Sequence, residues 1–431
     1  MWNLCQTFSF QSLLIFHQRE IRLLKALDRG HRVTRVMEAY EKSDRAELPK
    51  HLRTDGVKWL FVPVKVILDA LSVWPERQNK ITLTLSLAVI ISYLYIFTAQ
   101  ISFILDKNTD LSTAADAIAG VIAAIETAGR RIISIFLAKK IAKILLTVYF
   151  EFWPSDLVTP ELSRLLTRRS WILLVAVACY TSSALFWSSQ CLTVPFQLRD
   201  TPLPSKFTFP YLSSPFYEMV YIWEGVLSVE LAINICSFDW FFMSVIWSCT
   251  AQFRLLREYL KANFVKAEAS GQAWELMVKC IKHHQLLIET TKNIEGMLTV
   301  FILIVYLGTV GTVCLSGFLL TIVRTEFGRP LTYFCGHMSQ IFLYCFIGNE
   351  LSRESLALAD SVYECGWHLT AYDRRVRKSL ILIMARAQRP ITITLGGFGV
   401  LSLGSYMKLL KFCFSVYTLL STMMAKQRNT L

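Results

Sequence analysis

The sequence predicts an all-α membrane protein with seven transmembrane helices, and its composition and long uncharged runs support this fold class. The chain has 431 residues, of which 54% are hydrophobic and only 18% are charged, less charge than soluble proteins usually carry. Four runs contain no Asp, Glu, Lys or Arg, and each is close to or above the roughly 20 helical residues that cross a bilayer. These runs are residues 81–105, 171–198, 297–323 and 331–349.

Three further apolar stretches bring the expected number of spans to seven, although each contains charged residues. They cover residues 111–137, 217–250 and 391–425. Ionisable groups are costly next to lipid, so we expect them to face protein or the membrane interface. For the carboxylates of residues 217–250, a structural ion pair, a cavity-lining role and a proton relay all remain open. The charged residues are Asp116, Glu126, Arg130, Arg131, Glu224, Glu230, Asp239, Lys408 and Lys411.

Basic residues predict the orientation of the spans. Fourteen Lys and Arg precede residue 81, and others gather between spans two and three, four and five, and six and seven. The loops on the opposite side, with the C-terminal tail, hold only seven. By the positive-inside rule, the N-terminus and the three basic loops are cytoplasmic and the C-terminus is extracellular. The net charge of +13 is therefore attributed to topology, and no nucleic-acid partner is expected.

The chain divides into a cytoplasmic lead, one membrane domain and a short extracellular tail, at residues 1–80, 81–425 and 426–431. The lead ends in an amphipathic stretch, residues 64–75, whose Trp74-Pro75 suits the membrane interface. Helical patterns continue past spans four and six, and residues 253–297 predict one uninterrupted helix entering span five. We expect these helices to project into a cytoplasmic anchor bundle. The spans are about 81–105, 111–137, 171–198, 217–250, 297–323, 331–350 and 391–425.

The sequence carries no motif for catalysis, for a cofactor or for G-protein coupling. It lacks Gly-x-Ser-x-Gly, His-Glu-x-x-His and P-loop patterns, so it predicts neither an enzyme nor a cofactor. Asp-Arg-Tyr and Asn-Pro-x-x-Tyr are also missing, and the N-terminus of a G-protein-coupled receptor lies outside. His283 and His284 point about 100° apart on a helix, so we expect a solvated or interfacial pair and no metal site. The eleven cysteines predict mostly buried free thiols.

Aromatic and small residues gather in the outer halves of four spans. Tyr180, Ala184 and Trp187, for example, lie at i, i+4 and i+7 and so share one helix face. Aromatic faces opposite small residues would enclose a largely apolar pocket for a small volatile ligand. Ordinary helix packing is the alternative. The candidate pocket residues are Ala119, Ile122, Tyr180, Ala184, Trp187, Met219, Trp223, Tyr333, Phe334, His337 and Ile341.

The last span carries a stripe of small polar and apolar residues. Its members recur at i, i+4, i+7 and i+8, which places them on one side of a helix. A stripe of this kind on a terminal helix is compatible with a pore wall and a hydrophobic gate, and lipid-facing packing is the alternative. The stripe consists of Ser415, Leu419, Thr422 and Met423.

The end of the chain contains several short motifs in a fixed order, and together they resemble the C-terminus of insect odorant receptors. The resemblance extends over roughly residues 64–424 and is most specific from Cys345 onward. The motifs are Tyr363 with Trp367, Arg377-Lys378-Ser379-Leu380, Met384-Ala385-Arg386-Ala387-Gln388-Arg389-Pro390, Gly396-Gly397 and Tyr417-Thr418-Leu419-Leu420.

This resemblance implies the ligand-specific subunit of an odorant-gated, non-selective cation channel. It implies a heterotetramer with the olfactory co-receptor in the bilayer of a sensory-neuron dendrite. The family's odorant site lies among spans two to six in the outer half, and its last helix lines the pore. The implied gate is therefore the stripe on the last span. The implied subunit anchor comprises Arg377, Lys378, Leu380, Met384, Arg386 and Pro390.

Three other classes of membrane protein were weighed against this one. The co-receptor itself has a long insertion between spans four and five, for which residues 253–297 are too short. A gustatory receptor has the same topology but usually ends in Thr-Tyr followed by Gln-Phe, and Val416-Tyr417-Thr418 departs from this ending. A secondary transporter would need inverted repeats and broken helices, of which Gly396-Gly397 is the one candidate break.

Overall fold

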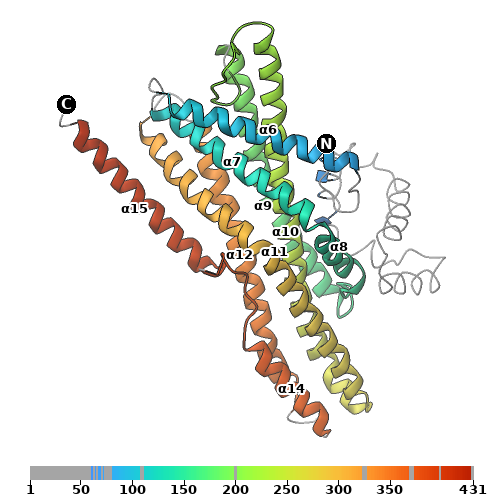
Figure 1. Ribbon diagram of the computed structural model, residues 1–431. Coiled ribbons are helices and arrows are strands. Elements are labelled where there is room, and N and C mark those ends of the chain that lie inside the picture. The colour runs from blue at the N-terminus through green and yellow to red at the C-terminus, as the bar shows by residue number, and fades with distance from the viewer. Residues whose placement is uncertain are drawn as a thin grey trace.

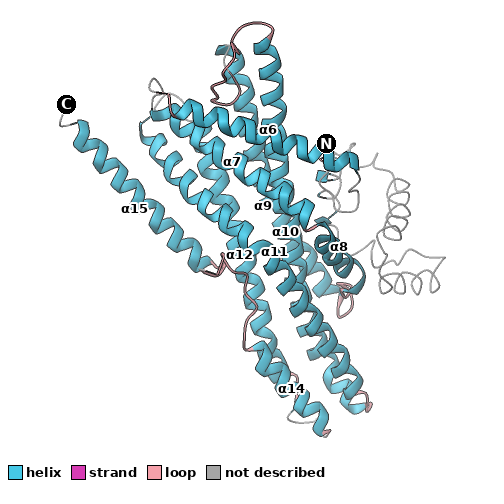
Figure 2. Cartoon of the chain, viewed as in Figure 1, coloured by secondary structure: helices cyan, strands magenta, loops and turns pink. Residues whose placement is uncertain are grey.

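The structure, a computed structural model, is a bundle of long helices joined by short loops (Figures 1 and 2). It describes residues 60, 61, 64, 67, 68, 71, 80–106, 111–198, 201–322, 328–367, 373–397 and 399–428. Within these residues the only β-type pairing is an isolated bridge between Thr394 and Val400. The expected all-α fold is therefore confirmed. Most of the expected lead at residues 1–80, including all of residues 1–59, lies outside the described residues.

The helices follow the expected order along the chain. The helices are α6 (Lys80–Ile104), α7 (Leu111–Phe136), α8 (Ala138–Leu146), the π-helix η3 (Thr147–Glu151), α9 (Pro160–Leu198), α10 (Phe216–Ala269), α11 (Ala273–Ile322), α12 (Gly328–Glu364), α14 (Arg374–Ala387) and α15 (Leu403–Arg428).

Four of the described helices are long and apolar enough to cross a membrane. They are α6, the Pro160–Thr193 part of α9, α10 and the Ala273–Gly317 part of α11. The other three expected spans, at residues 111–137, 331–350 and 391–425, fall on α7, α12 and α15. These helices contain more charged or polar residues, so length and composition alone do not distinguish them as spans.

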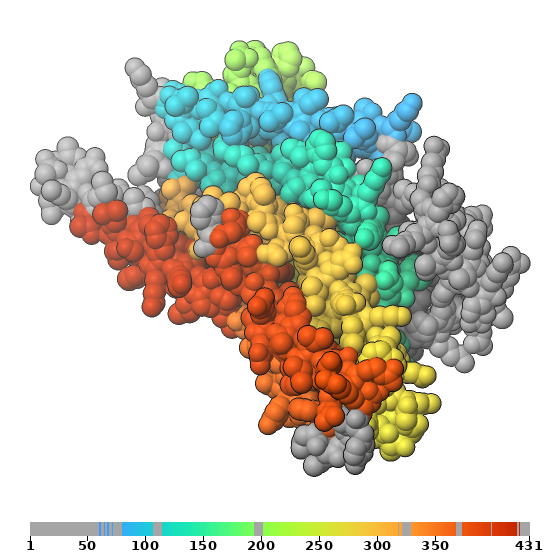
Figure 3. All heavy atoms as spheres, turned by 60° about the horizontal axis from the view of Figure 1, so that its bottom comes forward, coloured from blue at the N-terminus to red at the C-terminus, as the bar shows by residue number. Residues whose placement is uncertain are grey.

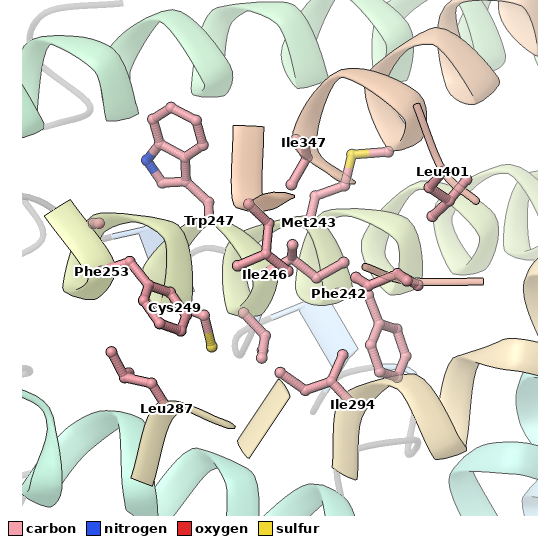
Figure 4. Close-up of a cluster of buried hydrophobic side chains, with 14 of the residues drawn as sticks. Phe242, Met243, Ile246, Trp247, Cys249, Phe253, Leu287, Ile294, Ile347 and Leu401 are labelled. Carbon is pink, nitrogen blue, oxygen red and sulfur yellow. The ribbon is translucent and has the colours of Figure 1, made fainter. Parts of the chain in front are cut away.

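Helix α10 is the centre of the bundle. In the most apolar stretch of α10, 78% of the residues are buried inside the protein. In the corresponding stretch of α6, only 17% are buried. Phe242, Ile246 and Cys249 of α10 face Leu287 and Ile294 of α11 (Figure 4). Ile347 of α12 and Leu401 close the same apolar core from the other side. A helix that is apolar around its whole circumference is expected at such a central place.

The link between α10 and α11 differs from the prediction. One uninterrupted helix was expected over residues 253–297, but α10 ends at Ala269 and α11 begins at Ala273. Gly271 has a φ of 72°, a conformation that favours glycine, and the Gln272 amide donates to the Ala267 carbonyl at 2.8 Å. The chain therefore reverses here, and the two helices form an antiparallel pair.

The lower ends of α10, α11 and α12 extend beyond the rest of the bundle and are joined there by α14 (Figure 1). Both α11 and α12 contact α14. Helix α10 has 54 residues, about 80 Å at 1.5 Å per residue, far more than a bilayer needs. The expected projection of helices out of the membrane layer thus has a structural counterpart, which we call the anchor bundle.

His283 and His284 are buried in the anchor bundle, so they are not the solvated or interfacial pair that the sequence predicts. His283 is 4% exposed, and its ring stacks on Trp153 with the ring centroids 4.0 Å apart. The Gln252 carbonyl oxygen lies 2.9 Å from His283 Nε2, and its amide nitrogen donates to the Trp153 carbonyl at 2.7 Å. These contacts fix the loop after η3 against α10 and α11.

The last expected span begins later than predicted. The described residues 391–397 and 399–402 are not helical, and α15 begins at Leu403. The segment folds back on itself: the Leu401 amide donates to the Ile393 carbonyl at 2.8 Å, and Gly396 and Gly397 have positive φ. Leu401 is fully buried against α12, where a Cβ on Gly348 would lie 2.7 Å from the Leu401 Cβ. The described part of this apolar segment is a turn anchored by three buried side chains, Ile393, Leu395 and Leu401.

Helix α15 lies along the edge of the molecule. In the space-filling view it forms a ridge on one side, whereas α6 and α7 cover another side (Figure 3). Its main neighbours among the described helices are α11 and α12. Phe412, Phe414 and Leu419 are 55%, 68% and 60% exposed. An isolated chain therefore leaves much of this apolar helix uncovered.

Candidate functional site

A compact group of buried side chains lies near the loop that connects α9 to α10, and we call it the outer cluster. Five helices contribute to it, and the alanines of α7 leave room for the aromatic rings of the other helices. Its members are Tyr93 and Ile96 of α6, Ala119, Ala123 and Ala124 of α7, Trp187 and Cys191 of α9, Leu203 of the loop, Leu227 and Leu231 of α10, and Tyr333 of α12.

Aromatic contacts organise the outer cluster. The rings of Trp187 and Tyr333 lie 5.1 Å apart, and Tyr333 stacks parallel to His337. Trp223 packs against the cluster and lies 6.3 Å from Phe207 in the loop. Such tilted and offset ring pairs add to the energy of apolar burial. The result is an apolar, aromatic-rich site with few hydrogen-bonding groups.

The structure brings together part of the predicted pocket. Ala119, Trp187 and Tyr333 belong to the outer cluster, and Trp223 packs against it. Met219 is 65% exposed, so its side chain faces away from these residues. Met219 lies one turn before Trp223 on the same face of α10. It is in the first turn of this helix, where its side chain is exposed.

The remaining candidates lie around the outer cluster. Tyr180 and Ile341 belong to the larger core at mid-depth, with Ala184 and Phe334 packed against that core. His337 contacts the cluster through Tyr333. Ile122 faces α11, where a Cβ on Gly308 would meet its Cγ2 at 2.9 Å.

A cleft of about 410 Å³ opens above the outer cluster, at the end of α6. It is lined by both polar and apolar side chains, and Lys206 forms an ion pair with Asp106 at its edge. The loop is tied down beside the cleft: the Lys206 amide donates to the Ala99 carbonyl, and the Leu203 amide donates to Glu224 at 3.1 Å. The cleft residues are Ser102, Leu105, Asp106, Lys206, Phe207 and Thr208.

A fully buried ion pair lies next to the outer cluster, between Arg130 of α7 and Asp239 of α10. The guanidinium lies 3.2 Å from Asp239 and 3.1 Å from Glu126, and it covers the ring of Phe301 at 4.8 Å. A buried charge is tolerated only when it is paired and hydrogen-bonded, and this one is. Three neutral groups also donate to Asp239, namely Tyr180 at 3.0 Å, Gln340 at 2.6 Å and Tyr344 at 2.9 Å.

A second buried pair involves the next residue of α7. Arg131 donates to Glu230 at 2.5 Å, and Tyr93 donates to the same carboxylate. Asn234 completes the group at 3.2 Å. The two adjacent arginines thus hold two carboxylates of α10. The sequence indicated structural pairing as one reading for these carboxylates, but it did not identify the arginine partners.

Helix α12 connects the outer cluster to the buried charges and to α15. His337 Nδ1 lies 3.3 Å from Gln340 Oε1, and Gln340 donates its amide hydrogen to Asp239. On another side of α12, the ring of Phe342 lies 5.4 Å from Tyr406 of α15. One helix therefore contacts the candidate ligand site, the ion-pair network and the terminal helix.

The candidate gate residues lie on the uncovered part of α15. Ser415 and Thr422 are exposed, and Leu419 is 60% exposed. The Thr422 hydroxyl donates to the Thr418 carbonyl of its own helix at 2.7 Å. The side chain of Met423 lies outside the described residues. The exposed stripe is available to a neighbouring subunit, a pore or lipid.

The candidate anchor residues divide between a buried and an exposed face of α14. Leu380 is fully buried and Met384 is half-buried, whereas Arg377 and Lys378 are exposed. Asp373 caps the helix by accepting from the Arg375 amide at 2.8 Å, and the Arg375 side chain lowers the pKa of Asp373. Arg386 donates to the Arg389 carbonyl, and Pro390 follows as an exposed residue.

A buried glutamate binds the upper part of the anchor bundle together. Glu354 of α12 is 1% exposed and forms an ion pair with Arg257 of α10 at 3.0 Å. Arg353 and Arg254 approach the same carboxylate at 2.9 and 3.7 Å. The basic residues between the expected spans therefore stabilise contacts between helices as well as marking the topology.

These features define a multi-pass membrane protein with membrane-length helices, an aromatic-rich cluster at one end, buried ion pairs and a helical anchor bundle. A family model described as 7tm Odorant receptor matches residues 158–414, which is more than half of the chain. The chain therefore belongs to the odorant receptor family. This is a family of receptors, and the protein is not an enzyme.

Individual relatives agree with this assignment. Odorant receptor Or2 of Anopheles gambiae is 26% identical over 248 residues, covering 54% of this chain and 65% of that protein. Odorant receptor 22c of Drosophila melanogaster is 30% identical over 196 residues, covering 40% of this chain and 48% of that protein. The chain thus spans about half to two thirds of the length of these two relatives.

A solved structure shares the fold. The insect olfactory receptor OR5 from Machilis hrabei, in complex with eugenol, superposes with a TM-score of 0.72 over 87% of this chain and 100% of that chain. The two sequences are 16% identical, so the likeness concerns the fold alone.

Proposed function

We propose that this chain is the ligand-specific subunit of an odorant-gated, non-selective cation channel. It would work with an olfactory co-receptor in the plasma membrane of a sensory-neuron dendrite, with four subunits around one pore. The observation that carries the proposal is the position of α12, which contacts the outer cluster through Tyr333 and contacts α15 through Phe342.

The outer cluster is the proposed odorant site. Its members are buried, mostly apolar and rich in aromatic rings, which suits a small volatile molecule held by shape and dispersion. The cleft beside Phe207 is the proposed approach to this site. Similarity to a receptor solved in complex with eugenol is in keeping with this use of the fold.

The proposed pore wall is the exposed stripe of α15. Ser415, Leu419 and Thr422 face away from the chain's own bundle, so in an assembly of four they would face neighbouring subunits or the pore axis. An apolar side chain such as Leu419 would close a narrow pore by excluding water. Met423, the residue after Thr422, belongs to the same stripe by its position in the sequence.

Gating requires a difference in binding energy between two states. An odorant opens the channel only if it binds the open state more tightly, and a tenfold preference corresponds to about 1.4 kcal/mol. A small rearrangement of α12 around the bound odorant would reach α15 through the Phe342–Tyr406 contact and the Gly348–Leu401 contact.

The anchor bundle is the proposed site of subunit assembly. Ile381 and Leu382 of α14 are 52% and 69% exposed beside Arg377 and Lys378. Exposed apolar residues with a charged rim are typical of an interface between subunits.

The proposal is tested by whole-cell recording from cells that express this chain with and without an olfactory co-receptor. Volatile esters, alcohols, terpenes and acids are applied in turn. We expect a weakly selective cation current that requires both the odorant and the co-receptor. Odorant-evoked current without the co-receptor would contradict the proposed assembly. Silence in both, with the chain verified at the cell surface, would contradict odorant gating.

A further inference from the structure

Two buried polar side chains at the outer cluster have no hydrogen-bond partner among the described residues. Trp187 is a member of the cluster and is 7% exposed, yet its indole Nε1 meets no acceptor. Gln100 is fully buried on α6, and neither atom of its amide has a partner. Buried polar groups are usually satisfied in native proteins, so unpaired polar groups at a proposed ligand site are available to a polar atom of the ligand.

Gln100 lies at the margin of the outer cluster. It follows cluster residue Ile96 by one helical turn, so both lie on the same face of α6. Across from it, a Cβ on Gly120 would lie 2.6 Å from the Gln100 amide nitrogen. Gly120 directly follows cluster residue Ala119. The glycine therefore makes room for the amide without supplying a side-chain partner.

The hydroxyls of Ser188 and Ser205 near the cluster also lack a partner among the described residues, whereas two comparable ring donors are paired. Tyr93, a member of the same cluster, donates to the Leu227 carbonyl at 3.0 Å as well as to Glu230. Trp247, in the inner core, donates from its indole to Ser170 at 3.0 Å. Tyr93 and Trp247 thus have acceptors within the protein, whereas the Trp187 indole does not.

We propose that the ligand of the outer cluster is a volatile molecule with one acceptor oxygen, as in a ketone, an ester or an alcohol, and that this oxygen receives the Trp187 indole hydrogen. The Gln100 amide is the second polar contact, able to donate to the same oxygen or accept from a hydroxyl. This inference rests on the proposed function. It replaces a purely apolar ligand with an oxygenated one.

Selectivity follows from the cost of a buried donor without a partner. A hydrocarbon of the same size fills the site but leaves the indole hydrogen unpaired, whereas an oxygenated ligand pairs it. We expect about a tenfold difference in half-maximal concentration between the two ligand classes. Removing the donor should abolish this difference while leaving the apolar contacts in place.

The test records concentration–response curves in cells that also express the co-receptor. A ketone, a primary alcohol and an acetate ester are each compared with the hydrocarbon of equal heavy-atom number. Trp187→Phe keeps a ring but removes the donor, and Gln100→Leu removes the second contact from a different helix. Trp171→Phe is the matched control, because that ring lies on α9 and is 52% exposed.

We expect Trp187→Phe to weaken responses to oxygenated ligands about tenfold, with responses to hydrocarbons and surface expression unchanged. Gln100→Leu should weaken them in the same direction, and Trp171→Phe should not. Equal potency of hydrocarbons and oxygenated ligands in the unmodified receptor would overturn the inference while leaving odorant gating intact. Unchanged selectivity in both variants would also overturn it. Silence towards every ligand would contradict the proposed function itself.

Discussion

At the scale of single residues, the contacts of Asp239 indicate a structural role for its carboxylate. Its carboxylate is fully buried, pairs with Arg130 and accepts from Tyr180, Gln340 and Tyr344. These partners come from three helices besides its own, namely α7, α9 and α12. A carboxylate surrounded in this way is suited to fixing helices in place, and this favours the structural reading over a proton relay.

Replacement of Asp239 by Asn is therefore expected to leave the Arg130 charge poorly compensated. The expected loss is about 3–5 kcal/mol of stability, because an uncompensated buried charge is strongly destabilising. The measurement is thermal unfolding of the detergent-solubilised receptor. Asp106→Asn is the control, since Asp106 pairs with Lys206 near the surface, and such a pair is worth about 1 kcal/mol or less.

A double-mutant cycle with Arg130→Gln separates pairing from other effects. The combined variant should lose less stability than the sum of the two single variants, because each single change leaves the partner charge alone. Additive losses, or an Asp239→Asn variant as stable as Asp106→Asn, would contradict the structural ion pair.

Residue-level prediction from the sequence was only partly successful at this site. Trp187 and Tyr333 were predicted to line one site and they do contact each other, because aromatic residues at helical spacing mark a face well. Met219 failed because it lies in the first turn of α10, where its side chain is exposed, although Trp223 one turn further on the same face packs against the cluster. The Arg130–Asp239 partnership spans 109 positions, and nothing in local spacing predicts it.

At the scale of elements, the helices were predictable wherever apolar runs were long, and the breaks between them were harder. Residues 391–402 contain no charge and read as part of the last span, but those that the structure describes form a partly buried turn. Hydrophobicity does not distinguish an apolar turn packed in protein from a helix packed in lipid. Gly271 was likewise missed, because the polar helical pattern continues on both sides of it.

The turn before α15 is expected to depend on Gly348. An added Cβ would lie 2.7 Å from the Leu401 Cβ and 2.8 Å from its carbonyl oxygen, so Gly348→Ala must displace the turn. Overpacking of this kind costs about 1–3 kcal/mol. We expect reduced thermal stability and smaller odorant-evoked currents at equal surface expression.

Gly296→Ala is the matched control for this prediction. Gly296 lies inside α11, and an added Cβ there would meet nothing within 4 Å. Alanine in a helix is favoured over glycine by about 0.5–1 kcal/mol, so this variant should be as stable as the original or slightly more stable. Equal thermal stability and equal odorant-evoked currents in Gly348→Ala and Gly296→Ala would contradict the prediction that the turn before α15 depends on close packing against α12.

At the scale of the whole molecule, the distribution of basic residues and the helical path together predict the topology. An odd number of spans places the termini on opposite sides, with the basic loops and the anchor bundle inside. An epitope at the C-terminus should be labelled on intact cells, and an epitope at the N-terminus only after permeabilisation. The reverse pattern, or equal labelling of both termini, would contradict seven spans in this orientation.

The central claim is that an odorant in the outer cluster opens a pore bordered by α15. The most direct measurement is odorant-evoked current in cells that co-express the co-receptor, before and after an extracellular charged thiol reagent, in the Leu419→Cys variant. The unmodified chain serves as the control, because its ten described cysteines are all free. We expect the reagent to reduce the current of the Leu419→Cys variant and not that of the unmodified chain. The reduction should develop faster while odorant is present, because the open pore gives the reagent access to the new cysteine. An unchanged current, with modification of the new cysteine verified, would contradict the claim that Leu419 borders the pore.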